Sequence, residues 1–225
     1  PDFERNKKRI LDKIKYVDAS FLTTSPDVLN FLKTENKYFI PNPSDKSFEI
    51  LNNFNKSCNV DVFFALSHGV HRGVLKSGKK DDRIGFLKDL MNKTPDVKFD
   101  LYGIDKVQPI WADHYFKTIS NAKMGLNLSR GEAIKYYSSD RITQIVGNGL
   151  VCLIDEKTKY QNFFNENEMV FYKNMSDLSE KILKISSDDK LRKNIAKRGK
   201  LKYMKYFNSD LVSKYIIDKI IGVKS

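Results

Sequence analysis

Two polar loops carry most of the side chains in this sequence that could bind a phosphorylated ligand. The first loop, residues 67–83, is rich in glycine and in basic side chains. It contains Ser67, Gly69, His71, Arg72 and Lys76. Glycine lets a backbone approach a phosphate closely, and Arg or Lys neutralises its charge. A solvated lysine- and glycine-rich loop has the same composition, and for each lysine alone that is the more common case.

The second loop leads from an apolar run into a helical pattern. Ser138, Ser139 and the amides that follow begin this helix, and a helix N-terminus attracts an anion. The loop and helix also supply three basic side chains and two acceptors for hydroxyl groups, which are Arg130, Lys135 and Arg141, and Glu132 and Gln144. Taken singly, Ser139 is most often only an N-cap and Arg141 a surface ion-pair former. Taken together, these residues favour a ligand with both phosphates and hydroxyls, and a nucleotide sugar has both.

Several other ligand classes lose support because their motifs are missing from the sequence. Neither a GxGxxG pattern nor a P-loop pattern occurs, which disfavours nicotinamide dinucleotides and the usual cradle for ATP. No Asp-x-Asp pair is present to hold a divalent ion against a diphosphate, so we expect no strict metal requirement. Cys58 and Cys152 lack metal-ligand spacing and are predicted to be reduced, structural thiols.

Alternating strands and helices are predicted to position both loops. Short apolar runs alternate with segments of helical period after Val60, which indicates βαβ units. The predicted strands are residues 60–67, 97–103, 123–129, 150–155 and 168–172, and the predicted helices are residues 81–93, 110–120, 140–148, a short one near 160–164, and 176–186. About five strands predict an α/β domain with a doubly wound, Rossmann-like parallel sheet and helices on both faces, whose ligands bind outside the carboxyl ends of the strands.

The two ends of the chain have different patterns. Two further helices are predicted after Ser187, the second of them capped at residues 208–210. The residue pairs expected to cap helices are Ser139 with Asp140, Ser176 with Asp177, and Ser187 with Asp188. At the other end we expect a strand, a helix, a strand and a linker, at residues 17–24, 26–34, 37–40 and 52–59.

Composition indicates a globular protein with a basic surface. The 225 residues are 40% hydrophobic, enough to fill a core, and the formal net charge is +12. We interpret this charge as a solvated surface rather than a polyanion-binding face, because the lysines are spread through the chain. The sequence has no apolar run of about 18 residues and no signal-like segment at its polar N-terminus, so a cytoplasmic setting is expected.

Four segments carry a family resemblance. They are "YFIPNPSD" (38–45), "DVFFALS" (61–67), "KMGLNLSRG" (123–131) and "RITQIVGNGLVCLID" (141–155). The last segment is similar to a family pattern of Arg-x-x-Glu, an apolar pair, a glycine turn and an apolar strand. Together they resemble the C-terminal lobe of glycosyltransferases of the two-Rossmann-domain type, GT-B, in the group 1 superfamily and its spore-coat-type branch. The resemblance covers most of residues 16–207.

The resemblance implies roles for individual residues. The basic catalytic role near the diphosphate would fall to Arg72 and Lys76, with His71 beside them. The ribose-binding glutamate of the family lands on Gln144, and the first of the two glutamates of many retaining relatives lands on Tyr136. Neither glutamate is kept, so the stereochemical outcome stays open. The other expected donor contacts are Ser67, Gly69, Arg130, Glu132, Ser139 and Arg141.

The resemblance also implies an activity and a division of the chain. We expect a glycosyltransferase of cell-surface glycan or glycoconjugate synthesis, with a UDP- or GDP-sugar as donor and no tightly bound cofactor. Its acceptor would be a glycan, a lipid-linked molecule or a protein, with peripheral membrane contact but no nucleic acid. The expected units are the end of an N-terminal acceptor lobe with its linker (1–59), the donor-binding domain (60–207) and a C-terminal helix (208–225), so that the chain begins within the first lobe.

Two alternatives remain open at the level of the sequence. A sugar-nucleotide epimerase of the same architecture would react without an acceptor. A non-catalytic module that binds nucleic acid or another polyanion would be retained on heparin or RNA, although the sequence has no RNA-recognition aromatic motif and no recognisable pair of DNA-binding helices. Saturable binding of one nucleoside diphosphate would favour the transferase.

Overall fold

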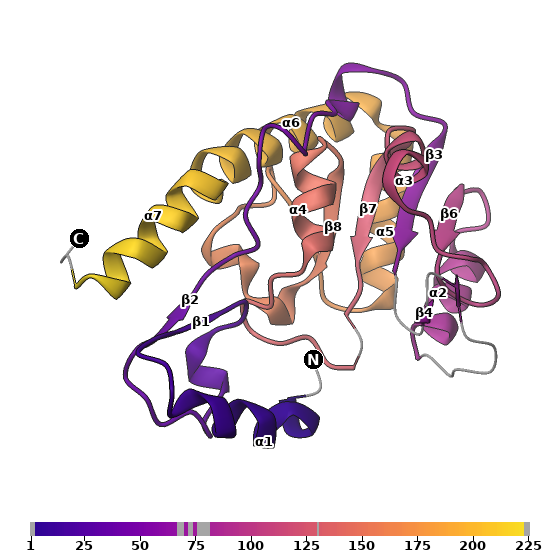
Figure 1. Ribbon diagram of the computed structural model, residues 1–225. Coiled ribbons are helices and arrows are strands. Elements are labelled where there is room, and N and C mark those ends of the chain that lie inside the picture. The colour runs from indigo at the N-terminus through magenta and orange to yellow at the C-terminus, as the bar shows by residue number, and fades with distance from the viewer. Residues whose placement is uncertain (1–2, 67–69, 72–73, 76–81, 130, 223–225) are drawn as a thin grey trace.

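The computed structural model describes residues 3–66, 70–71, 74–75, 82–129 and 131–222 (Figure 1). The described residues form a parallel sheet wrapped by helices, with a smaller N-terminal unit beside the carboxyl ends of the strands. Among these residues, no helix has both the length and the apolar character needed to cross a membrane.

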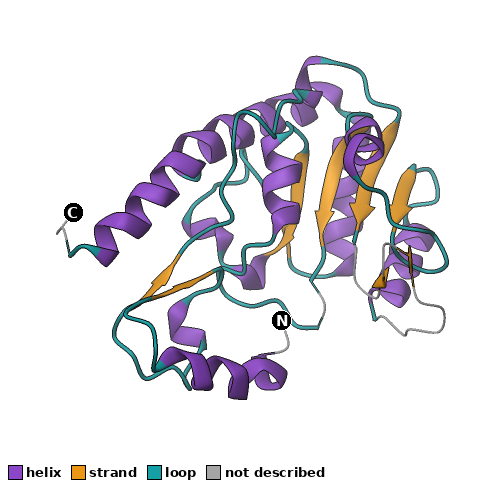
Figure 2. Cartoon of the chain, in the orientation of Figure 1, coloured by secondary structure: helices purple, strands orange, loops and turns teal. Residues whose placement is uncertain are grey.

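A five-stranded parallel sheet forms the centre of the molecule (Figure 2). Its strands in chain order are β3 (Val60–Ala65), β6 (Phe99–Tyr102), β7 (Ala122–Asn127), β8 (Val151–Asp155) and β9 (Val170–Tyr172). In space the order is β6-β3-β7-β8-β9, and every neighbouring pair is parallel. Four of the five strands lie within the segments predicted from the apolar runs, and β7 begins one residue before its segment, so the prediction of a doubly wound α/β sheet is confirmed.

Helices cover both faces of this sheet. They are α2 (Arg83–Lys93) and α5 (Met175–Ser187) on one face, and α3 (Ala112–Ile119) and α4 (Asp140–Gly147) on the other. The first pair packs Leu90 and Ile182 into one apolar cluster, and the second pair packs Ile119 and Ile145 into another. Gly125 of β7 lets α4 approach the sheet closely, because a Cβ at this position would lie 2.4 Å from Ile145 Cγ1.

Two helices end the chain, as predicted. They are α6 (Asp189–Tyr206) and α7 (Ser209–Ile220), and both start at an expected cap. Asp188 accepts a hydrogen bond from the Leu191 amide, and Asn208 accepts one from the Leu211 amide. The cap expected for α5 is wrong by two residues, because Asn174 rather than Ser176 accepts the bond from the Asp177 amide.

The N-terminal unit departs further from the sequence prediction. It contains α1 (Phe3–Ile14), which the sequence analysis missed, and a two-stranded parallel sheet of β1 (Ser20–Leu22) and β2 (Lys37–Phe39). The prediction of a helix at residues 26–34 is wrong, since only a 3-10 turn, η1 (Pro26–Val28), forms there. Leu29 leaves helical geometry at φ −104° and ψ 66°, and the chain then folds back so that Leu29 and Leu32 are both buried.

The segment expected to be a linker is packed into the fold. It forms a 3-10 turn, η2 (Asn53–Asn55), in which the Asn53 side chain is fully buried. Asn53 Nδ2 donates to the carbonyls of Ile119 and Ala122, each at 2.8 Å, and so joins the turn to α3 and β7. Two further 3-10 turns, η3 (Glu156–Thr158) and η4 (Tyr160–Asn162), follow β8. Both cysteines are free and buried, as expected.

Candidate functional site

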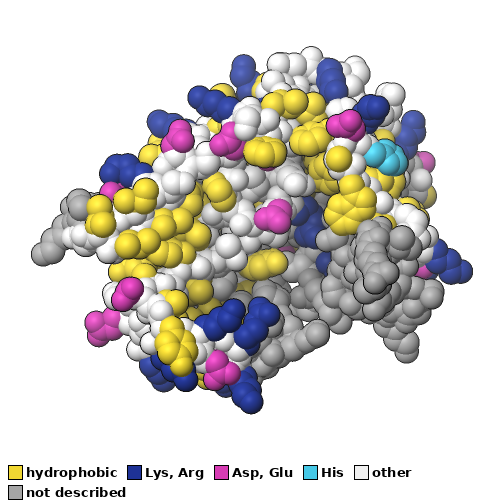
Figure 3. Space-filling model, viewed as in Figure 1, with side chains coloured by type: hydrophobic (Ala, Val, Ile, Leu, Met, Phe, Trp, Pro, Cys, Tyr) yellow, Lys and Arg dark blue, Asp and Glu magenta, His cyan; other side chains and the backbone are white. Residues whose placement is uncertain are grey.

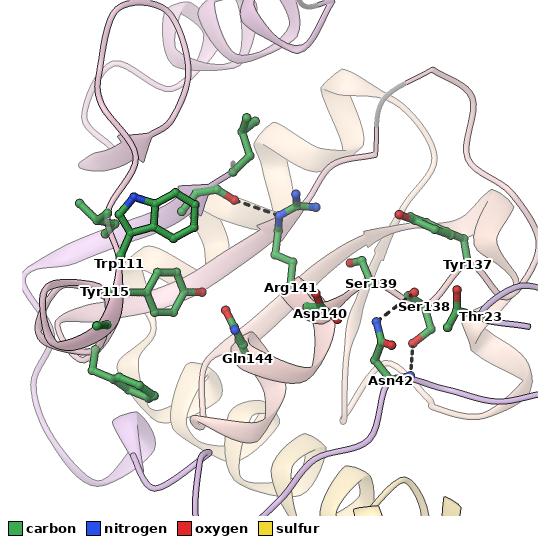
Figure 4. Close-up of a pocket in the computed structure, with 15 residues that line it drawn as sticks. Thr23, Asn42, Trp111, Tyr115, Tyr137, Ser138, Ser139, Asp140, Arg141 and Gln144 are labelled. Carbon is green, nitrogen blue, oxygen red and sulfur yellow. Dashed lines mark hydrogen bonds between the residues drawn. The ribbon is translucent and has the colours of Figure 1, made fainter. Parts of the chain in front are cut away.

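A cleft of about 650 Å³ opens at the carboxyl ends of β3 and β7 (Figure 4). The chain leaves β3 toward β6 on one side of the sheet and later returns to β7 on the other side, so these two strands form the topological switch point at which such sheets bind ligands. The cleft is lined by Thr23, Asn42, Ala65, Leu66, Ile110, Trp111, Ala112, Tyr115, Phe116, Tyr137, Ser138, Ser139, Asp140, Arg141 and Gln144.

Arg141, in the first turn of α4, brings a fixed positive charge to the floor of the cleft. Its Nε donates to the Ala65 carbonyl at 3.2 Å, and its Nη1 donates to the Leu128 carbonyl at 3.3 Å. The guanidinium also lies 5.0 Å from the centre of the Phe64 ring. These contacts come from the ends of both switch-point strands, so the side chain is held in place before any ligand arrives.

The electrostatics around Arg141 favour an anion. Burial lowers the pKa of its guanidinium from the ordinary value, and the nearby positive charge of Arg83, a buried residue of α2, lowers it further. The Arg141 charge is therefore partly desolvated, and a bound anion would compensate it.

The N-terminus of α4 adds backbone donors to this positive region. Ser139 is the N-cap residue, but its side chain makes no capping hydrogen bond, because its Oγ donates to Asn127 Oδ1 at 3.0 Å instead. The first amides of the helix therefore have no side-chain cap, which is the arrangement of a helix terminus that can bind an anion. Asn127 Oδ1 also accepts from Arg141 Nη1 at 3.4 Å, and the buried Nδ2 of Asn127 has no partner among the described residues.

Aromatic side chains form the wall of the cleft at the start of α3. Trp111 is 50% exposed at the lip, and Tyr115 lies below it, packed edge to face on Phe63. Ala112, between them, adopts a left-handed φ of 47°, a costly conformation for a residue with a side chain. Figure 4 shows Gln144 projecting into the space between Tyr115 and the first turn of α4.

The N-terminal unit supplies the opposite wall and holds the second loop. The Ser138 amide donates to the Thr23 carbonyl at 2.7 Å, and its Oγ accepts from the Asn42 amide at 2.8 Å. Asn42 Nδ2 also donates to the Ser138 carbonyl at 3.2 Å. Nearby, the Lys135 carbonyl accepts from Thr24 Oγ1 and from the Ser25 amide. The loop that leads into α4 is therefore anchored by residues more than 90 positions earlier in the chain.

The structure brings together three of the side chains expected to contact the donor. Ser139, Arg141 and Gln144 all line the cleft. Glu132 is exposed and does not line it, and Lys135 is held in an ion pair with Asp27 at 2.6 Å. The remaining expected residues, Ser67, Gly69, Arg72, Lys76 and Arg130, lie outside the described part of the chain. His71 is described only as part of a short hairpin, β4 (Val70–His71) with β5 (Val74–Leu75).

Several lining residues were missed by the sequence analysis. Trp111 and Tyr115 were interpreted only as members of a helix, and Thr23 and Asn42 were assigned to the end of another lobe. Asn127, which does not line the cleft but contacts Ser139 and Arg141, was also missed, although a polar residue between two leucines at the end of β7 was a signal for it. The described residues contain no cluster of three or more His, Cys, Asp or Glu side chains that could hold a metal ion.

The sequence profile of a family described as "Glycosyl transferase-like" matches residues 83–218. The chain belongs to this glycosyl transferase-like family. The matched region starts at α2 and ends in α7, and it therefore contains Arg141, Gln144 and the aromatic wall. The profile names no narrower branch. Among curated proteins, no sequence matches the chain.

Solved glycosyltransferase structures share the fold of the chain. A variant of S. aureus TarM, in complex with UDP, fondaparinux and alpha-GlcNAc-glycerol, superposes with a TM-score of 0.68 at 14% identity over 96% of this chain and 46% of its own. Sucrose-phosphate synthase from Thermosynechococcus elongatus superposes with a TM-score of 0.61 at 14% identity, over 97% of this chain and 63% of its own. Anabaena HepE in complex with UDP superposes with a TM-score of 0.65 at 9% identity, over 95% of this chain and 66% of its own. The chain thus spans about half of TarM and matches the GT-B fold.

Proposed function

We propose that the chain binds the nucleotide-sugar donor of a glycosyltransferase in the cleft between β3, β7 and α4. The observation that carries this proposal is the position of Arg141, which is fixed at the switch point beside the uncapped N-terminus of α4. Family membership supports glycosyl transfer, and UDP is named with two of the structural neighbours. UDP is therefore the first nucleotide to test.

The cleft offers a place for each part of such a donor. The diphosphate would lie against Arg141, Ser139 and the first amides of α4, with Arg72, Lys76 and His71 of the first loop as further proposed contacts. Gln144 would accept hydrogen bonds from the ribose hydroxyls, and the base would lie against the aromatic wall at Trp111. This order follows the cleft from its floor to its lip (Figure 4).

The chemistry follows from that placement. An acceptor hydroxyl forms a bond to the anomeric carbon and loses its proton, while the bond from that carbon to the diphosphate breaks and the nucleoside diphosphate leaves with the electron pair. Fixed positive charge next to the leaving oxygen stabilises the developing negative charge, and such prearranged groups need no reorganisation during the reaction. We assign this role to Arg141 and the α4 amides, together with the basic residues of the first loop.

The proposal also divides the chain by task. Residues 60–207 would hold the donor, residues 1–59 would belong to the end of an acceptor lobe, and residues 208–225 would form a terminal helix. Because the chain spans about half of TarM, the complete activity and the acceptor, whether a glycan, a lipid-linked molecule or a protein, belong to the proposal.

Thermal unfolding in the presence of UDP, GDP, ADP and uridine tests donor binding. A nucleoside diphosphate at about 100 times its dissociation constant should stabilise the protein by about 2.7 kcal/mol, and the free nucleoside should stabilise it far less. Arg141→Lys keeps the charge but cannot span the Ala65 and Leu128 carbonyls, so the shift should shrink. The matched control is Arg198→Lys, the same substitution at an exposed position of α6 away from the cleft, which should leave the shift unchanged. Equal shifts in both variants, or no shift at millimolar nucleotide, would refute the proposed site.

A further inference from the structure

The positive charge of the chain is concentrated on one helix. Helix α6 has eight Lys or Arg residues and one acidic residue in 18 positions, a net charge of +7, whereas the whole chain carries +12. The even spread of lysines expected from the sequence therefore does not hold for α6. Figure 1 shows this helix along the upper edge of the molecule, whereas the cleft opens at the lower, carboxyl ends of the strands.

Half of these cations are committed to contacts within the protein. Arg192 is fully buried and donates to the carbonyls of Asn53 and Lys56. Lys200 donates to the carbonyls of Glu49 and Leu51. The side chains of Lys193 and Lys202 form ion pairs, with Asp189 and Glu168 respectively.

The other four cations form an exposed stripe. They are Lys190, Lys197, Arg198 and Lys205, all exposed and all without an acidic partner among the described residues. Successive members are seven, one and seven residues apart, so at 3.6 residues per turn they fall within an arc of about 100° on one side of the helix. We call these four residues the basic stripe. Figure 3 shows blue Lys and Arg side chains along the upper edge of the molecule, where α6 runs.

Apolar side chains lie within the same surface. Leu201 is 61% exposed and has Lys197 and Lys205 one turn away on either side. Tyr206 is 52% exposed, with the Lys205 ammonium 4.9 Å from the centre of its ring. Cations beside exposed aliphatic and aromatic side chains can bind anionic headgroups while the apolar groups enter the membrane interface. A surface for nucleic-acid backbone would need the cations but would gain nothing from an exposed leucine.

We propose that the outer face of α6 docks on an anionic lipid membrane. The basic stripe would bind the lipid headgroups, while Leu201 and Tyr206 would enter the boundary between headgroups and acyl chains. The donor cleft opens at the opposite ends of the strands, so docking leaves it uncovered. This inference does not depend on the proposed nucleotide site, and its test needs no nucleotide.

Co-sedimentation with lipid vesicles tests the proposal. The chain should bind vesicles of phosphatidylcholine with phosphatidylglycerol but not vesicles of phosphatidylcholine alone, and binding should weaken as salt is added. Each cation near an anionic membrane contributes about fivefold in affinity. The triple variant K197Q/R198Q/K205Q should therefore bind roughly 100-fold more weakly.

A matched variant controls for net charge alone. K93Q/K98Q/K117Q removes the same charge from three exposed lysines, on α2, just before β6 and on α3, and should bind nearly as well as the parent chain. Leu201→Gln should weaken vesicle binding but leave retention on RNA unchanged. Absence of binding to anionic vesicles, or an equal loss in the two triple variants, overturns the proposal. Tighter binding to RNA than to vesicles, with no effect of Leu201→Gln, would assign the face to nucleic acid instead.

Discussion

Gln144 stands where the family resemblance leads us to expect a glutamate. Its side chain is partly exposed and lines the cleft beside Tyr115, whereas its neighbours Ile142, Ile145 and Val146 are fully buried. The position of Gln144 at the margin of the buried face of α4 means that the amide faces the cleft without disturbing the packing of the helix. An amide can still accept hydrogen bonds from hydroxyls, but without the full negative charge of a carboxylate.

Two substitutions of Gln144 distinguish a ligand contact from a packing residue. Gln144→Ala should lower nucleoside diphosphate affinity by about 1 kcal/mol or more, because a hydrogen bond to the ribose is lost. Gln144→Glu should retain or tighten binding, since an ionised acceptor makes the stronger bond. Isothermal titration with UDP, together with the melting temperature of each variant, measures both effects. A strongly destabilised Gln144→Glu protein, with normal binding by Gln144→Ala, would remove Gln144 from the proposed site.

The site residues that the sequence could predict share one property. Ser139, Arg141 and Gln144 lie within six positions of each other at a helix start, so local patterns of capping and period were enough to bring them together. Trp111, Asn42 and Asn127 come from three distant segments, and only the packing of α3, the N-terminal unit and β7 around the switch point places the first two at the cleft and the third against Ser139 and Arg141. No local pattern in a single sequence carries that information.

At the scale of elements, the same contrast explains which predictions held. The five strands were found because buried parallel strands are continuous apolar runs. The turn η2 was mistaken for a linker, because its polar residues are characteristic of linkers. Asn53 is nevertheless buried, and its Nδ2 donates to the carbonyls of Ile119 and Ala122.

Substitutions on helix α6 measure how much a buried polar side chain contributes to stability. Arg192→Ala should destabilise the protein by about 3 kcal/mol or more, because the substitution leaves buried carbonyls of η2 without a donor and opens a cavity. Arg198→Ala, six positions further along the same helix and exposed, should change stability by no more than about 0.5 kcal/mol. Urea denaturation of the two variants gives both values. Similar losses would contradict the division of α6 into an inner and an outer set of cations.

At the scale of the whole molecule, one carboxylate takes part in joining the N-terminal unit to the end of the chain, beside the backbone pairing of Ser44 with residues 207–209. Asp45 Oδ2 accepts from Ser209 Oγ at 2.6 Å, and Asp45 Oδ1 accepts from the Ser47 amide at 2.9 Å. These hydrogen bonds lower the pKa of Asp45 to about 2, and the bond from Ser209 has the largest effect. The charged carboxylate is therefore favoured in the folded state, and it ties the "PNPSD" segment to the first turn of α7.

This pKa gives stability a defined pH dependence. A depressed folded-state pKa contributes stability above the unfolded value of 3.8, and the contribution is lost as pH falls toward about 2. Asp45→Asn should therefore melt at a lower temperature than the parent chain at pH 7, and the gap should narrow below about pH 4. Melting curves of both proteins from pH 7 to pH 3 provide the comparison. A gap that stays constant with pH would show that the charge of Asp45 contributes nothing.

Trp111 at the lip of the cleft has a practical consequence for solution studies. It is the single tryptophan of the chain, and half of its surface is open to solvent beside Tyr115. Light absorbed by indole but not by phenol therefore excites one known position in the molecule. The wavelength and the intensity of the indole emission should change when a ligand enters the cleft. Nucleotide titrations can therefore be followed by intrinsic fluorescence on the unlabelled protein.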